Sequence, residues 1–172
     1  MALLTEQQYH EKLEETKTMN ASIEESISLK SHNFIAKEMH KIDGYLDRVS
    51  VLLNEAIENK SERERNLKTK EVNFQLQCDG ELADNKEIQE LKSSDLRKAK
   101  LNTKFKQNVE EVNIFEGDLI LAKAFYEQIS NKYSRLTSKL SSLTKELDTF
   151  NNMLTTKSII SSMQKKLDMG GQ

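Results

Sequence analysis

Proline and tryptophan are absent from this sequence of 172 residues, which has only five glycines and one cysteine. Without proline no position enforces a break, and this favours long helices. A single cysteine, Cys78, excludes an intrachain disulfide and suits a reducing environment. We therefore expect a cytoplasmic or other reducing intracellular location.

An excess of one charge and a long apolar run are also lacking. The net charge is −2, although 31% of the residues are charged, so no global field attracts nucleic acid or a membrane. No window approaches eighteen apolar residues, and the first ten residues show no signal-peptide pattern. We expect no membrane partner, and any nucleic-acid binding would need a local basic patch.

A 3-4 hydrophobic repeat between Leu101 and Leu154 is the strongest pattern present. Fifteen of its sixteen a and d positions are apolar or aromatic, and Asn108 is the exception. The a positions are Phe105, Val112, Leu119, Tyr126, Tyr133, Leu140, Leu147 and Leu154, and the d positions are Leu101, Asn108, Phe115, Ala122, Ile129, Leu136, Leu143 and Phe150. A seam of this period must be buried against another helix, which predicts an all-α coiled-coil protein.

The helix boundaries follow from breaks in this periodicity. We predict one elongated helical domain over residues 1–172, with helices at 3–30, 34–77 and 85–167. The turn is predicted at 78–84, because Gly80 in the stretch Cys-Asp-Gly can adopt a positive φ and end a helix. Asp84 and Glu87 resemble a capping box for the third helix.

Two arrangements of these helices remain open. In a long antiparallel hairpin kinked near residue 31, the turn near Gly80 makes residues 35–56 face 105–126. The first helix would then face 134–158. In the alternative, the first helix folds back to give a three-helix arrangement.

The segment 112–126 is apolar on more than its seam. Four residues lie off the a and d positions and are candidates for an interface: Ile114, Ile120, Leu121 and Phe125. A helix that is apolar on several faces is buried on several faces. Either the first helix or another subunit is expected to cover this segment.

Cations concentrate on both sides of the predicted turn, in two stretches that together form the basic zone, 60–70 and 92–106. The candidate residues for binding nucleic acid or an anionic partner are Arg63, Arg65, Lys68, Lys70, Lys92, Arg97, Lys98, Lys100, Lys104 and Lys106. Phosphate backbones bind such surfaces through counterion release. A solvated helical face and a surface for an acidic protein are the alternative interpretations.

Signatures of catalysis are missing from the sequence. We find no phosphate loop, nucleophile elbow or dinucleotide fingerprint, and the histidines lack neighbours at metal-ligand spacing. Cys78 is interpreted as structural. We therefore expect no enzyme, no catalytic residues, no cofactor, no metal and no small-molecule substrate.

The stretch Leu46–Leu140 begins with a helix that contains Val-Leu-Leu-Asn-Glu-Ala. A Lys/Arg-rich segment, a polar break and Leu-Lys-Ser-Ser-Asp-Leu-Arg-Lys-Ala-Lys follow. This layout resembles that of the phage recombination mediators, small helical proteins that load a recombinase on single-stranded DNA. The similarity is one of layout, so it assigns no individual residue. The acidic first helix and the strict C-terminal heptads depart from it.

Two functions follow as expectations. The seam predicts a non-enzymatic coiled-coil structural or adaptor protein that oligomerises or assembles with other helical proteins. The resemblance and the basic zone imply the alternative, an oligomeric mediator that binds single-stranded DNA.

Overall fold

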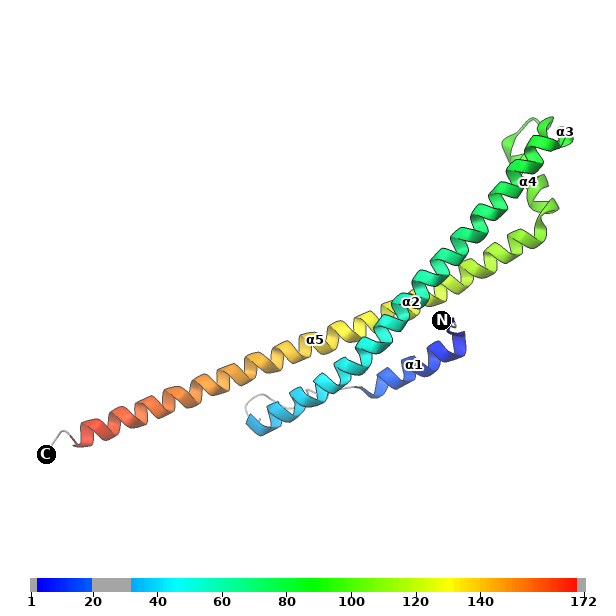
Figure 1. Cartoon of the computed structure of the whole chain (residues 1–172). Coiled ribbons are helices and arrows are strands. Elements are labelled where there is room, and N and C mark those ends of the chain that lie inside the picture. The colour runs from blue at the N-terminus through cyan, green and yellow to red at the C-terminus, as the bar shows by residue number, and fades with distance from the viewer. Residues whose placement is uncertain (1–2, 20–31, 170–172) are drawn as a thin grey trace. The chain divides into compact units, whose positions relative to one another are not determined.

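The computed structural model describes residues 3–19 and 32–169, with side chains as far as Gln164. Every regular element in these ranges is a helix (Figure 1), which confirms the all-α class. The helices are α1 (Glu6–Thr18), α2 (His32–Asp84), α3 (Lys86–Gln89), α4 (Ser94–Lys104) and α5 (Lys106–Met169). Contacts divide the chain into unit 1, Met1–Leu13 with Leu53–Ile129, and unit 2, Glu14–Leu52 with Ser130–Gln172.

Unit 1 is a hairpin in which α2 and α5 lie side by side, and α3 and α4 form the connection (Figure 1). Polar contacts fix the register, since Lys70 binds Glu111 at 2.8 Å and Gln77 accepts from Asn108 at 2.9 Å. The apolar seam of α5 is buried here at Leu119, Ala122 and Ile129. The predicted hairpin of packed helices is thus present.

Unit 2 contains the other parts of α2 and α5. Ile35, Ile42 and Val49 are buried at exact heptad spacing on α2, and Leu136 and Leu143 are buried on α5. Near the start of α2, the ring of His32 contacts the ring of Phe150 on α5, with centroids 6.0 Å apart. Every residue from 151 to 164 is exposed. The prediction that Leu154 extends the buried seam is therefore wrong, because its side chain is 51% exposed.

The predicted turn at 78–84 is also wrong, since α2 continues through Gly80 to Asp84. Cys78 is buried with Ile88 and Leu101, and Phe74, Leu82 and Phe105 pack against this cluster. Leu82 shares a helix face with Cys78 only if the helix continues through Gly80. Packing on both sides of the glycine therefore overrides its weak helix propensity.

This shift of the turn changes the register of the hairpin. The predicted register placed Lys70 opposite Leu91, whereas Lys70 contacts Glu111. The predicted partner of each α2 residue is therefore displaced by about twenty residues. The displacement arises because the prediction ends the helix at Gly80, whereas tertiary packing extends it to Asp84.

The predicted long third helix is divided into α3, α4 and α5. Asn85, rather than Asp84, caps α3, because its side chain accepts from the amide of Glu87 at 3.1 Å. Ser93 caps α4 by accepting from the amide of Leu96 at 3.1 Å. Phe105 interrupts the helix with φ −104° and ψ 35° before α5 begins. Both caps are the residue types that satisfy free amides at helix starts.

Gly80 provides a test of the continuous α2. A Cβ added at this position would meet no atom within 4 Å. Because glycine costs about 1 kcal/mol relative to alanine inside a helix, we expect Gly80→Ala to raise the free energy of unfolding by about that amount. Urea denaturation measures the change, and Gly44→Ala, which is equally open, is the control. A loss of stability in Gly80→Ala alone would indicate a turn at this position.

The first helix is shorter than predicted, and residues 20–31, including most of the predicted break near residue 31, lie outside the described residues. A capping box starts α1, since Thr5 donates its amide to Gln8 Oε1 at 2.8 Å and Thr5 Oγ1 accepts from the Gln8 amide at 3.3 Å. Tyr9 stacks on Phe125 with ring centroids 4.7 Å apart. The extended hairpin would place this helix against 134–158, whereas Tyr9 contacts Phe125, so the fold-back alternative describes unit 1 correctly.

Candidate functional site

A network around Arg63 holds the N-terminal segment in unit 1. The Arg63 guanidinium donates to the carbonyl of Leu4 at 2.6 Å and to the hydroxyl of Tyr9 at 3.3 Å, and it forms an ion pair with Asp118. Asn59, one turn earlier on α2, accepts from the amide of Leu4 at 2.8 Å. We call these five residues the Arg63 network. It joins α2 and α5 to α1 and to the chain before α1.

This network corrects one predicted site residue. Arg63 occupies the next heptad position after Val49 and Ala56, and the residue is only 7% exposed. A buried charge is stable only with partners, and the Leu4 carbonyl, Tyr9 and Asp118 provide them. Arg63 therefore faces the interior of unit 1 and is not available to a phosphate backbone.

Five other candidate cations of the basic zone have carboxylate partners. These pairs are Arg65 with Glu62, Lys70 with Glu111, Lys100 with Glu87, Lys104 with Glu81 and Lys106 with Glu110. Hydrogen bonds from Lys104 and Asn85 lower the pKa of Glu81, and the hydrogen bond from Lys70 lowers that of Glu111. Arg97 donates to the carbonyl of Leu91 at 2.9 Å. The zone is thus partly neutralised within its own unit.

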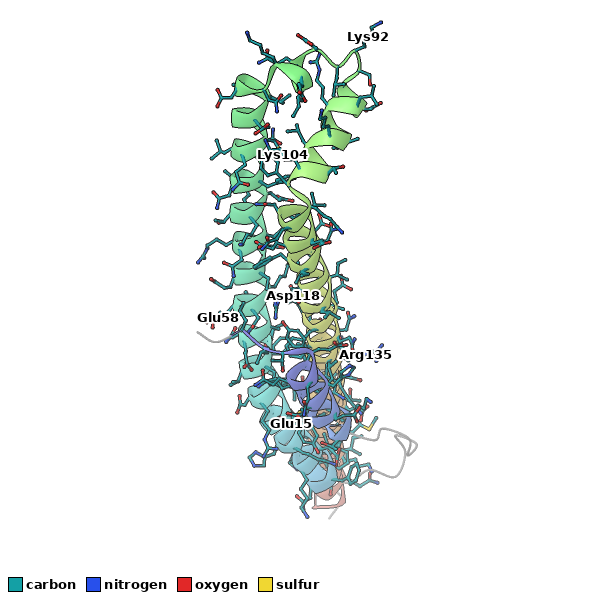
Figure 2. The ribbon with its side chains drawn as sticks, turned by 90° about the vertical axis from the view of Figure 1, so that its right-hand side faces the viewer. Glu15, Glu58, Lys92, Lys104, Asp118 and Arg135 are labelled. Atoms are coloured by element: carbon teal, nitrogen blue, oxygen red, sulfur yellow. The ribbon has the colours of Figure 1, made fainter. Side chains whose placement is uncertain are left out.

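The remaining candidates, Lys68, Lys92 and Lys98, are exposed. Figure 2 shows Lys92 in the connection between the long helices and Lys104 on α4 beside α2. Lys100 and Lys104 also line a groove between α3 and α4, together with Asn85, Ile88, Ala99 and Thr103. The cations at this end therefore stand beside a partly apolar groove.

The four candidates for an interface separate into two groups. Phe125 is 2% exposed and is covered by Tyr9, so its assignment to a surface between subunits is wrong. Ile114, Ile120 and Leu121 remain 64%, 67% and 39% exposed. The first helix therefore covers one side of the segment 112–126 and leaves another side open.

Cys78 lies in the core rather than in a turn. Burial first, and the charge of Asp79 second, raise the pKa of its thiol. Its interpretation as a structural residue agrees with its place beside Ile88 and Leu101. Among the described residues there is no cluster of three or more His, Cys, Asp or Glu fit to hold a metal, and none of the helices has a stretch apolar enough to cross a bilayer.

Sequence reasoning missed the Arg63 network and a cation cluster in unit 2. Leu4, Arg63 and Asp118 are more than fifty residues apart, so no local pattern connects them. Lys132, Arg135 and Lys139 share one face of α5 by their spacing of three and four, a signal that the sequence does contain. Partial burial, and then repulsion from Arg135 and Lys139, lower the pKa of Lys132.

Comparisons with known proteins give no relative. No family model matches the chain, and no curated protein or solved structure is significantly similar to it.

Proposed function

We propose that this protein is a non-enzymatic coiled-coil structural or adaptor protein that assembles with itself or with other helical proteins. The supporting observation is that large apolar side chains of α5 remain exposed although the helix packs against other helices of the same chain. Ile114 and Ile120 are exposed in unit 1, and five more are exposed in unit 2: Met153, Leu154, Ile159, Ile160 and Met163. Apolar helical faces of this kind are characteristic of surfaces that bind another helix.

Sedimentation equilibrium across the micromolar range tests this proposal. We expect a concentration-dependent increase in mass above the 19.8 kDa of one chain, because association removes these side chains from water. A monodisperse monomer at the highest concentration, without any binding partner in pull-downs, would contradict the proposal.

A second candidate function is binding of single-stranded DNA by the end of unit 1 at which α3 and α4 connect the long helices. The groove between α3 and α4 favours it, because Lys100 and Lys104 line this groove together with the exposed Ala99. Single-strand binding sites combine cations for the backbone with apolar or aromatic surface for the bases. Exposed Lys92 and Lys98 extend the positive surface.

The double substitution Lys98→Gln with Lys100→Gln tests this candidate. Each lost phosphate contact lowers the slope of log affinity against log salt by about 0.7 for a single strand, so we expect a decrease of about 1.4. Anisotropy of a labelled oligo-dT at several salt concentrations measures it.

The matched control is Lys37→Gln with Lys157→Gln, which removes two charges from exposed positions of unit 2. Its affinity and salt slope should equal those of the wild type. If the wild type fails to bind at low salt, DNA binding is excluded, and an unchanged slope in the α4 variant would place the contact elsewhere.

A further inference from the structure

α5 carries a second row of residues at heptad spacing in unit 1. Ile114, Gly117, Leu121 and Ala124 are separated by three, four and three residues, as successive a and d positions are. All four are exposed. We call this row the outer seam.

The outer seam points away from the seam that packs in unit 1. At about 100° per residue, the four residues lie about 80° to 160° around the helix from Ala122, which is 1% exposed. The outer seam is therefore a separate face, and covering it does not require the hairpin to open.

No contact within the described part of the chain accounts for the glycine at position 117. Glycine weakens a helix interior, yet a Cβ at this position would meet nothing within 4 Å. The backbone of α5 has a helical φ here, so no turn requires a glycine. A glycine on an open helix face does allow another backbone to approach closely.

The four residues complement themselves when two helices pair in opposite directions. In an antiparallel pair an a position faces a d position of the partner helix. Ile114 then lies against Ala124 of the second copy, and Leu121 lies against its Gly117. Each large side chain meets a small residue in all four layers, which fills space evenly. Parallel pairing would put Gly117 against Gly117 and leave a gap.

One charge that continues the outer seam favours the same direction. Glu110 is exposed and lies one heptad before Gly117. Parallel pairing would place Glu110 against Glu110 of the second copy, whereas antiparallel pairing places it near the neutral Gln128.

We propose that two copies of this chain pair in antiparallel orientation through the outer seam of α5. This inference rests on the proposed function, because it names the second copy as the partner helix. The two-fold axis passes near residue 119, so Ile120 lies close to Ile120 of the second copy. Ile114 lies about 15 Å from its own counterpart, given a rise of 1.5 Å per residue.

Charge substitution tests the surface. We expect Ile114→Glu with Leu121→Glu to raise the dimer dissociation constant about tenfold or more in sedimentation equilibrium, since each buried carboxylate would lack a partner. Leu76→Glu is the matched control, because Leu76 is 64% exposed, like Ile114, and lies on α2. Its dissociation constant should not change. If the double variant associates like the wild type, this surface is excluded, but the proposed function remains.

Crosslinking tests the orientation. In a Cys78→Ala parent, single cysteines are placed at Ile120, Ile114 and Ala124 and treated with a short bismaleimide. We expect Ile120→Cys to crosslink with itself, and Ile114→Cys to crosslink only when mixed with Ala124→Cys. Self-crosslinking of Ile114→Cys as efficient as that of Ile120→Cys would indicate a parallel pair and overturn the inference. If the wild type is monomeric at every concentration, both the antiparallel dimer and the proposed assembly of this protein with itself are contradicted.

Discussion

Replacing Phe125 by alanine is expected to lower the free energy of unfolding by about 3–5 kcal/mol, the usual cost of truncating a buried phenylalanine. The ring is 2% exposed and stacks on Tyr9, so its loss leaves a cavity between α1 and α5. Urea denaturation followed by circular dichroism measures the change.

The control for this prediction is Leu76→Ala, in which the truncated side chain is 64% exposed. We expect it to alter stability by no more than about 0.5 kcal/mol. A double-mutant cycle with Tyr9→Leu and Phe125→Leu should give a coupling of about 0.5–1.5 kcal/mol if the rings interact as the structure indicates. Equal, small effects of Phe125→Ala and Leu76→Ala would show that α1 does not cover Phe125.

Replacing Arg63 by methionine is expected to cost about 3 kcal/mol. The change leaves the Leu4 carbonyl and the Tyr9 hydroxyl without their donor, and it removes the partner of Asp118. Breaking a fully buried ion pair costs about 3–5 kcal/mol, and the lower end applies because the Asp118 side chain is 44% exposed. The same denaturation experiment measures the loss, and limited proteolysis should show that α1 has become accessible.

Arg65→Met is the matched control for Arg63→Met. Arg65 lies two residues away on α2, its side chain is 72% exposed, and it pairs with Glu62 one turn away. Exposed pairs of this kind contribute less than about 1 kcal/mol. A stable Arg63→Met variant with a protected α1 would show that an apolar side chain satisfies this heptad position and that the Arg63 network is dispensable.

The heptad repeat predicted the fold class well, because burial of a periodic face depends on sequence that is local to one helix. The d positions Ala122, Ile129, Leu136 and Leu143 are each no more than 3% exposed. The repeat could not give the register, which depends on where the chain turns. The turn predicted at Gly80 is absent, because the packing of Cys78 and Leu82 outweighs the cost of glycine relative to alanine in a helix, about 1 kcal/mol.

The candidate site was less predictable than the fold. Composition located the cations, but it could not show that Arg63 is buried or that Lys104 binds Glu81. Those outcomes depend on the register and on contacts between residues distant in sequence. Ile114, Ile120 and Leu121 lie off the seam and are exposed, so their assignment to an interface stays a prediction.

The single thiol provides an intrinsic probe of local opening at the connection end of unit 1. Cys78 is buried against Ile88 and Leu101, and this burial, which also raises the pKa of its thiol, slows its reaction while that cluster is closed. Its rate of alkylation, divided by the rate for a free thiol, therefore gives the equilibrium constant for transient separation of these helices. The wild-type chain can thus report how often this end opens, without an added label or a substituted residue.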